Sequence, residues 1–462
     1  MKYKNSKTVD AKYDKQEGNP FIESLPEELT KDEFIEQIES KLLFSPDVRK
    51  LNSKIRRRDI MQLTTWFYPM DYMYVLYDML YRAIISSYQT KKNIESIRNM
   101  NNIYMDFRTG AKSILHYSTQ AYSSAILGVP GIGKSSTIQR CLNTMPQVII
   151  HKEYNGKMFY TKQINYLFVE CPSDCSIRTL VYNVLLAIDQ AIETNYLEQN
   201  KSTKYASSSA LTAKLKIICI NHHIGLIILD EIQNAVYTAT QNKQVKPLIK
   251  FLVELTNETT ASICFCGTLD AEELFLKQEH LKRRTRGLRL YPMKYDIKYR
   301  NFITELWQYQ FTKKYIELDE KLMRQLYDLS GGIPAYIIKI FQEAQIQAIF
   351  SGREKLEYES LKKAISILAI KVPKYYGRQG NSISDFEVFD YQEDINNESF
   401  ICKDIQENSI ELKKTQKRYY ATPRGRKAAE RSKVDLIYLW KQNKDKIISL
   451  LETYEMVERR FF

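Results

Sequence analysis

The sequence lacks the apolar segments that a membrane protein needs. No uninterrupted apolar run in its 462 residues approaches the roughly 18 residues that cross a bilayer. The start of the chain, Met1 to Lys15, is polar and does not resemble the apolar stretch of a secretory signal peptide. We therefore expect a cytoplasmic protein that makes no contact with a membrane.

Cysteine is scarce, and its spacing fits neither a zinc site nor a disulfide framework. There are seven cysteines, an odd number, and the close pairs are Cys171-x-x-x-Cys175 and Cys264-x-Cys266. Neither pair has the spacing of zinc ligands. Because Cys219, Cys264 and Cys266 stand in apolar segments, we expect core thiols in a reducing compartment.

Acidic residues are outnumbered, since 55 Asp and Glu face 68 Lys and Arg, for a net charge of +13. Basic residues cluster at Lys54-Ile55-Arg56-Arg57-Arg58 and from Lys413 to Lys433, where Glu430 is the single acid. Such clusters favour a polyanionic partner, although a generic lysine-rich surface would give the same total. Neither cluster lies on an apolar stripe, so nucleic acid fits better than a membrane surface.

The succession of patterns divides the chain into four expected parts. Residues 1–95 are a polar and then helical extension for docking a partner or DNA. Its stretch 59–90 carries aromatic residues at helical spacing, which suits core packing or docking better than base stacking. Residues 96–292 are an α/β core, 293–370 a helical lid, and 371–462 a basic tail that contacts a partner or DNA.

Strand-like and helix-like segments alternate within the core, which predicts a parallel, doubly wound sheet. The strands are expected near 125–127, 147–150, 166–169, 226–229, 262–266 and 288–291, with a hairpin turn at Asn155-Gly156. Helices are expected near 176–193, 210–222 and 245–256, and a last one runs into Arg286. The lid is expected to be helical over 296–370, with one break at Gly331-Gly332-Ile333-Pro334, and 371–400 to be a linker.

The most informative stretch is the loop Gly128-Val129-Pro130-Gly131-Ile132-Gly133-Lys134-Ser135, which joins an apolar strand to a helix that continues through Ser136. The chain has only 15 glycines, and three of them stand here. Glycines let backbone N–H groups turn inward around a phosphate, and the helix N-terminus adds partial positive charge. Lys134 can reach the β- and γ-phosphates and Ser135 can ligate Mg²⁺. The alternative is a glycine turn with a chance lysine.

A pair of acids, Asp230 and Glu231, follows the buried-strand pattern Leu226–Leu229. In a parallel sheet the carboxyl ends of the strands share the edge at which the phosphate loop lies. Asp230 is expected to hold Mg²⁺ through water and Glu231 to polarise the attacking water. An acidic helix cap is the alternative.

Polar residues at two further places complete the expected site. Thr268, at the tip of the next strand, is placed to contact the attacking water or the γ-phosphate, unless it is a plain turn threonine. Arg283 and Arg284 belong to the cluster Lys282-Arg283-Arg284-Thr285-Arg286. They are expected to complete a neighbouring subunit's site as arginine fingers, ahead of Arg286, the alternative being a surface patch. No Asn-Lys-x-Asp guanine reader is found, so ATP is the expected nucleotide.

The phosphate loop, the Asp-Glu strand end, the polar strand tip, the trailing arginines and the helical lid together resemble an AAA+ ATPase. More specifically, four segments resemble the TnsC family of Tns-transposon regulators, relatives of TniB and MuB. They are Asn19–Pro26 (NPFIESLP), Ile224–Gln233 (IGLIILDEIQ), Gly267-Thr268 and Leu329–Gln345 (LSGGIPAYIIKIFQEAQ). The resemblance covers about residues 19–370.

That resemblance implies a bacterial, nucleoid-associated ATPase that uses ATP and Mg²⁺ and assembles as a ring or filament on double-stranded target DNA. It also implies a TnsD/TniQ-like protein that selects the target and TnsA/TnsB-like transposase subunits that the assembly activates. The family's Walker A falls on Gly128–Ser135 and its Walker B on Asp230 and Glu231. Sensor 1 falls on Thr268 and the arginine fingers on Arg283 or Arg284.

Some family features have no clear counterpart. The usual lid arginine has no clear counterpart after Gly332, where Lys339 is the nearest cation. DNA-contact positions do not transfer by motif, so charge and placement point to four candidates, which are Lys152, Lys157, Lys162 and Arg178. In the tail, Pro423-Arg424-Gly425-Arg426-Lys427 resembles a minor-groove hook or is a plain basic segment.

Two other functions remain open. A replication initiator or helicase loader would share the ATPase core but would need a C-terminal winged helix or a helicase-docking segment. A nucleotide-sensing scaffold that never touches DNA would need no basic clusters.

Overall fold

The computed structural model describes residues 7–13, 18–89, 122–174, 176–201, 208–234, 245–272, 285–372 and 385–390. The chain divides into two compact units, Met1–Tyr391 and Gln392–Phe462, and every described residue belongs to the first. Among the described residues, no helix is both long and apolar enough to cross a membrane.

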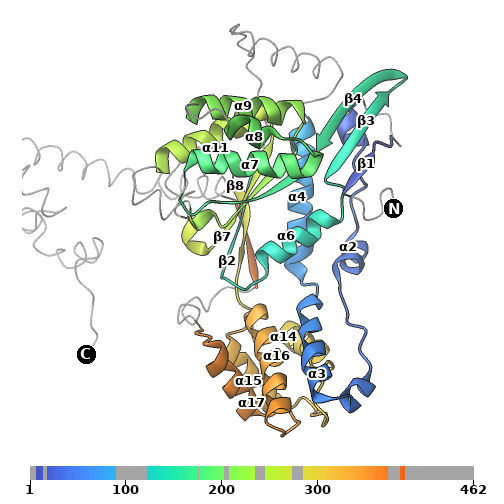
Figure 1. The fold of residues 1–462 in the computed structure, drawn as a ribbon, viewed down its shortest axis with the longest axis vertical. Helices are drawn as coiled ribbons and strands as arrows, with labels where there is room; N and C mark the ends of the chain where they lie inside the picture. Colours follow the sequence, from blue (N-terminus) through green and yellow to red (C-terminus); the bar gives the residue numbers. More distant parts are fainter. Residues whose placement is uncertain are drawn as a thin grey trace, which may run out of the picture. The chain divides into compact units, whose positions relative to one another are not determined.

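A six-stranded sheet in the order β5-β6-β7-β2-β8-β9 forms the centre of the first unit (Figure 1). The strands are β2 (Ser123–Gly128), β5 (Tyr166–Glu170), β6 (Leu226–Asp230), β7 (Ser262–Gly267), β8 (Thr285–Leu290) and β9 (Phe386–Asp390). The first five in spatial order pair in parallel, whereas β9 pairs antiparallel with β8. Parallel pairing brings the carboxyl ends of β2, β6 and β7 to one edge, where the site lies.

Strands β2, β6 and β7 are buried along their whole length, as their nearly continuous small and apolar residues require. The helices cover both faces of the sheet (Figure 1). One face carries α7 (Ile177–Ile192), α8 (Tyr196–Lys201), α9 (Ser208–Asn221) and α11 (Val245–Thr259), and the other carries α4 (Asp71–Gln89) and α6 (Lys134–Asn143). The predicted parallel sheet with helices on both faces is confirmed.

A separate three-stranded sheet contains the predicted hairpin, so the strand expected near 147–150 is not part of the central parallel sheet. Strands β3 (Val148–Tyr154) and β4 (Lys157–Ile164) pair antiparallel around Asn155 and Gly156, whose φ values of 50° and 71° suit a tight hairpin turn. A short strand β1 (Thr8–Asp10) adds in parallel to β3. The polar N-terminal sequence gave no sign of this strand, because its pairing partner lies about 140 residues away along the chain.

Four helices form the lid, namely α14 (Ile297–Trp307), α15 (Glu320–Ser330), α16 (Pro334–Phe350) and α17 (Tyr358–Leu368). The predicted break is confirmed. Gly331 ends α15 in the left-handed region with φ 62°, and Pro334 opens α16 at its first position. Buried apolar residues of the lid, Trp307 and Phe341 among them, belong to a core that is separate from those around the central sheet.

The N-terminal extension packs against both the sheet and the lid. It comprises α1 (Pro20–Glu23), α2 (Lys31–Ile38), the 3₁₀ helix η1 (Pro46–Lys50), α3 (Ser53–Asp59) and the 3₁₀ helix η2 (Ile60–Thr65), followed by α4. Phe21 and Phe34 join the core under β2 and α6, whereas Ile60 and Trp66 join the core of the lid. The extension thus links the α/β core to the lid, in addition to the chain segment that follows β8.

One residue of the first basic cluster is buried. The Arg56 side chain is 1% exposed, and its guanidinium donates to both carboxylate oxygens of Glu354 at 2.8 and 2.7 Å and to the carbonyl of Phe311 at 2.9 Å. The expectation that this cluster as a whole faces a polyanion is therefore wrong for Arg56, which fastens α3 to the lid.

The linker predicted over 371–400 contains an unexpected strand. Strand β9 extends the central sheet, with Phe389 opposite Gly287 in β8. A side chain at position 287 would meet the ring of Phe389 at 2.4 Å, so the glycine makes this pairing possible. The basic tail from Lys413 to Lys433, with the segment that resembles a minor-groove hook, lies outside the described residues.

Candidate nucleotide site

The stretch from Gly128 to Ser136 runs from the end of β2 through a glycine turn into the first turn of α6, as the sequence predicted. Gly131 and Gly133 have φ values of 83° and 103°, in the left-handed region that glycine adopts most readily. Gly128 lies so close to β8 that a Cβ would come within 2.9 Å of the Leu290 carbonyl oxygen. Gly133 caps α6 and has no side chain to bond the N–H groups of the first turn, which stay available for an anion.

The apolar residues of the loop are held by the core and by helix α4. Val129 and Ile132 are buried in the core that contains α4 and α6. From α4, the hydroxyl of Tyr72 donates to the Ile132 carbonyl at 3.3 Å and lies 3.5 Å from the Thr137 hydroxyl. Burial raises the pKa of Tyr72 to about 12, so the hydroxyl stays protonated and remains a donor. The aromatic pattern over 59–90 favoured core packing for this segment, but it did not predict the contact with the phosphate loop, because Tyr72 and Ile132 are 60 positions apart.

The Lys134 ammonium folds back over the loop. Its Nζ donates to the carbonyls of Gly128 at 2.8 Å and Val129 at 3.1 Å. Burial lowers the pKa of Lys134, while Cys266, Asp230 and Glu231 oppose that shift. A partly desolvated cation beside the N–H groups of the first turn of α6 is a favourable partner for phosphate oxygens.

The two acids at the end of β6 have different environments. Asp230 is 7% exposed, and its Oδ1 accepts a hydrogen bond from the Glu231 N–H at 2.9 Å. Glu231 is exposed and has a φ of 57°, which is unusual for a residue with a side chain.

Next to Asp230, burial and the carboxylate together raise the pKa of the Cys266 thiol, which stays protonated. Cys219, Cys264 and Cys266 are buried as expected.

An amide links the tips of β6 and β7. The Gln233 Nε2 donates to Glu231 Oε2, and the Gln233 Oε1 accepts from the Thr268 N–H at 3.1 Å. The Thr268 hydroxyl is buried and has no hydrogen-bond partner among the described residues. Thr268 directly precedes the 3₁₀ helix η3 (Leu269–Ala271), and its side chain makes no capping hydrogen bond to that helix. An unpaired buried hydroxyl at this edge suits contact with a phosphate or a bound water. Gln233 was not predicted.

The lid touches the phosphate loop directly. The N–H of Ala335, in the first turn of α16, donates to the Gly131 carbonyl at 3.2 Å. A Cβ on Gly131 would lie 3.2 Å from both the Ala335 Cβ and the Ile333 Cγ2. The lid therefore closes one side of the loop with backbone and apolar atoms. Lys339, the nearest lid cation, lies further along α16 and is exposed.

Oxygen atoms suited to a divalent cation come from few residues. The described residues contain no group of three or more His, Cys, Asp or Glu side chains that would form a metal cage. The Ser135 hydroxyl and the Asp230 carboxylate are hard oxygen donors of the kind that Mg²⁺ binds together with phosphate oxygens and water. The donors fit magnesium that arrives with a nucleotide.

The expected arginine fingers, Arg283 and Arg284, lie outside the described residues. The helix expected to run into Arg286 is wrong at its end, because β8 begins at Thr285 and Arg286 pairs with Ser124. The alternating Thr285–Leu290 stretch is a strand of the central sheet.

The four DNA-contact candidates differ in whether their side chains already bond other groups of the protein. Lys152 forms an ion pair with Asp10 at 2.7 Å, and Lys162 donates to the Ile192 carbonyl at 3.2 Å. The Arg178 guanidinium bonds the Tyr182 hydroxyl at 3.0 Å and lies 5.6 Å from the centroid of that ring. Lys157 is exposed beside the hairpin turn.

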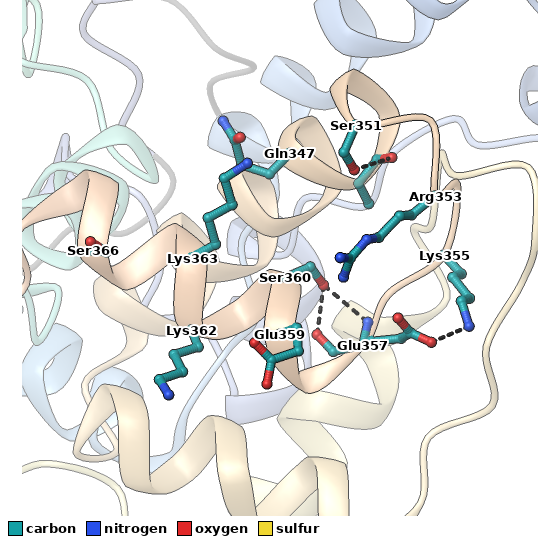
Figure 2. Close-up of a pocket in the computed structure, with 11 residues that line it drawn as sticks. Gln347, Ser351, Arg353, Lys355, Glu357, Glu359, Ser360, Lys362, Lys363 and Ser366 are labelled. Atoms are coloured by element: carbon teal, nitrogen blue, oxygen red, sulfur yellow. Dashed lines mark hydrogen bonds and ion pairs between the residues drawn. The ribbon is translucent and has the colours of Figure 1, made fainter.

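A separate hollow of 420 Å³ lies in the lid, between the end of α16 and α17 (Figure 2). Its lining is polar and mixed in charge, with Arg353 and Lys363 as well as Glu359. The Lys355 ammonium pairs with Glu357, and the Ser360 hydroxyl donates to the Glu357 carbonyl at 2.6 Å (Figure 2). None of the phosphate-loop residues lines this hollow, so it is not the nucleotide site.

Residues 117–275 match the family described as AAA domain. This region contains the phosphate loop, the Asp230-Glu231 strand end and Thr268. The described part of the chain has the AAA+ P-loop NTPase fold, a parallel sheet with many helices, which confirms the predicted fold class.

Several solved structures are similar at low identity. The Aeropyrum pernix ORC2 protein in its ADP form has a TM-score of 0.33 and 15% identity, over 63% of this chain and 70% of that one. The Aeropyrum pernix ORC1 protein in complex with DNA has a TM-score of 0.36 and 12% identity, over 58% and 64%. The Walker-type ATPase of Pyrococcus abyssi has a TM-score of 0.35 and 12% identity, over 53% and 67%.

This chain spans less than two thirds of the length of the ORC1 structure. Among curated proteins, none has a sequence significantly similar to it. Because the TM-scores of these three structures lie below 0.5, their likeness does not decide what this chain does, and its own site residues must.

Proposed function

We propose that this AAA+ chain binds and hydrolyses ATP and uses the nucleotide as a switch for assembly on double-stranded DNA, as a regulator of transposition. The single observation that carries the ATPase part is the convergence at one sheet edge of the phosphate loop, the Asp230-Glu231 pair and the Thr268 hydroxyl, which has no partner within the described part of the chain. Phosphate binding, metal binding and water activation each have a residue at that edge.

The chemistry proposed is phosphoryl transfer to water. A water oxygen attacks the γ-phosphorus, and the bond from that phosphorus to the bridging β–γ oxygen breaks, which gives ADP and inorganic phosphate. The Lys134 ammonium leaves the loop carbonyls for the β- and γ-phosphates, and Glu231 polarises the water. Ser135 and Asp230 would hold Mg²⁺, which neutralises phosphate charge. Thr268 contacts the water or the γ-phosphate through its hydroxyl.

Assembly follows from a site that one subunit does not complete. We place Arg283 or Arg284 against the γ-phosphate held by a neighbouring copy, so that ATP stabilises contacts between copies. The resulting ring or filament encloses duplex DNA, and Lys152, Lys157, Lys162 and Arg178 are the proposed contacts to the phosphates. Such contacts carry no sequence information, so binding is strong, nonspecific and dependent on salt.

The role in transposition rests on the resemblance of four segments to the TnsC family and on the net charge of +13. In that role the assembly links a TnsD/TniQ-like target selector to TnsA/TnsB-like transposase subunits. Hydrolysis then acts as a timer that loosens the assembly and resets the choice of target.

The test is binding to a duplex of random sequence over a series of salt concentrations, with ATP, with a slowly hydrolysed analogue and without nucleotide. We expect binding that needs ATP, falls steeply with salt and is lost in Lys134→Ala. A chain that hydrolyses ATP but ignores DNA is a nucleotide-sensing scaffold. A chain that binds DNA with ATP but stimulates a replicative helicase, and not a transposase, is a replication factor.

A further inference from the structure

We propose that Gln233 is a positioning residue that couples the γ-phosphate sensor to the residue that activates water, an inference that rests on the proposed ATPase function. Its amide lies between the tips of β6 and β7 and bonds one residue from each. On one side Nε2 donates to the Glu231 carboxylate, and on the other Oε1 accepts from the Thr268 N–H at 3.1 Å.

The chemistry of the two contacts requires an amide. A carboxylate acceptor faces one end of the side chain and an N–H donor faces the other, and an uncharged amide satisfies both. The same complementarity fixes which end is nitrogen. A glutamate at this position would keep the bond to Thr268 and lose the donor to Glu231, whereas a methionine would lose both.

Local structure makes room for this bridge. Position 267, at the end of β7, is glycine, and a Cβ there would lie 2.6 Å from Gln233 Oε1. The glycine therefore lets the amide oxygen reach the Thr268 N–H. Gln233 itself stands in the helical turn directly after Glu231, which puts its side chain back over the end of β6.

Glu231 needs a partner of this kind. Its carboxylate is exposed, and its φ of 57° turns the backbone away from the regular strand. Within the described part of the chain, the Gln233 amide donates the hydrogen bond that holds this carboxylate. Without the amide the carboxylate would sample several rotamers in solvent, and the fraction of time spent near the attacking water would fall.

The bridge would also make the position of the Glu231 carboxylate depend on whether a γ-phosphate is bound. The Thr268 hydroxyl is buried and unpaired among the described residues, while the N–H of the same residue is bonded to Gln233. When the hydroxyl engages a γ-phosphate or its water, a shift of the β7 tip moves the Gln233 amide and with it the Glu231 carboxylate. After phosphate leaves, the constraint relaxes.

The experiment measures kcat for ATP hydrolysis and the Kd of a fluorescent ATP analogue in Gln233→Glu and Gln233→Met, alone and combined with Glu231→Gln. We expect kcat to fall about 10- to 100-fold with Kd changed less than about threefold, because the amide orients the base and does not bind phosphate. In the Glu231→Gln background, the Gln233 variants should cause no further loss, since the two residues act through one another.

Gln347→Glu is the matched control. The Gln347 Nε2 donates to Glu343 at 2.7 Å, so the substitution makes the same change of one amide facing one carboxylate. Gln347 lies beside the lid hollow (Figure 2). It is twelve residues along α16 from Ala335, which is about 18 Å at 1.5 Å per residue. This variant should hydrolyse ATP at the wild-type rate.

Three results would overturn the inference. They are a wild-type kcat in Gln233→Met, losses that multiply in the Glu231→Gln background, and a Kd that weakens in proportion to kcat. Thermal unfolding of each variant shows whether a loss reflects misfolding, and Gln233→Glu keeps the size of the side chain for that reason. If the wild-type chain itself hydrolyses no ATP, the proposed function fails. An active wild type beside an unaffected Gln233→Met variant removes this inference alone.

Discussion

The backbone N–H of Ala335 donates to the carbonyl of Gly131 across 3.2 Å, so the first turn of a lid helix rests on the phosphate loop. This contact joins two segments that are about 200 residues apart in the chain, one in the α/β core and one in the lid. A displacement of the Gly131 carbonyl would therefore act on the first turn of α16 directly.

The first prediction concerns this contact. Gly131→Ala should weaken ATP binding by about tenfold or more, because the new Cβ meets Ala335 and Ile333 at 3.2 Å and the residue has a φ of 83°. Gly18→Ala is the control, since Gly18 has the same φ of 83° and nothing within 4 Å of the added Cβ. Titration with a fluorescent ATP analogue compares the two. Equal affinity in both variants would show that the lid contact is irrelevant to nucleotide binding.

Substitution of Lys134 and of Glu231, the proposed water-activating carboxylate, should separate binding from hydrolysis. Lys134→Ala should abolish ATP binding and ATP-dependent DNA binding, because no other described ammonium bonds the loop carbonyls. Glu231→Gln should slow hydrolysis at least about 100-fold while keeping or strengthening the assembly on DNA. Phosphate release and gel filtration measure the two effects. If Glu231→Gln disperses the oligomer while ATP still binds, the timer interpretation is wrong.

The buried pair of Arg56 and Glu354 should fasten the N-terminal extension to the lid. Arg56→Ala should lower the free energy of unfolding by about 3–5 kcal/mol, because it removes the cation from a largely buried ion pair and leaves the Lys313 N–H as the remaining donor to the Glu354 carboxylate among the described residues. Arg58→Ala is the matched control, since Arg58 is 76% exposed in its pair with Asp59 and should change stability by less than about 1 kcal/mol. Denaturant unfolding gives both values, and similar effects would contradict the assignment.

The same pair predicts a pH dependence. The hydrogen bond from Arg56 lowers the pKa of Glu354 from its ordinary 4.5, with burial opposing. The stabilisation is therefore fully present above pH 4.5 and is lost as the pH falls through the lowered folded pKa. Melting temperatures measured on acidification should fall less steeply in Glu354→Gln than in the wild type. Parallel curves would mean that this carboxyl contributes nothing to acid unfolding.

Lys157 should be the most productive DNA contact of the four candidates. It is exposed beside the hairpin turn, whereas Lys152, Lys162 and Arg178 already bond protein groups. Lys157→Ala should reduce the slope of log affinity against log salt by about one, the value for one phosphate contact. Lys321→Ala, an exposed lysine of α15, is the control. An unchanged slope in Lys157→Ala would remove the hairpin from the DNA interface.

The sequence identified the parts of the site that have local signals. The glycine spacing from Gly128 to Gly133, the apolar run before Asp230 and the Asn155-Gly156 turn each predict a conformation from a few neighbouring residues. The structure brings the first two to one edge through the parallel order of the sheet. The parallel direction of these strands follows from the alternation of strands and helices, so the fold class was predictable, although the order of the strands was not.

Contacts between distant residues were not predictable in this way. Tyr72 and Gln233 are ordinary helical residues by sequence, and only the packing of α4 and the tip of β7 gives them a role. Arg56 belongs to a basic cluster, yet its partner Glu354 is 298 positions away. Strand β9 is short and follows a polar segment, so its pairing with β8 depends on the glycine at position 287 and not on its own pattern.

The most direct test measures the mass of the wild-type chain on duplex DNA by mass photometry, with and without a slowly hydrolysed ATP analogue. ATP held between copies should produce an assembly of many copies on each duplex only when the analogue is present, and Lys134→Ala should not form it. A chain that stays monomeric, and that binds DNA equally with and without the analogue, would contradict the proposal that the nucleotide controls assembly.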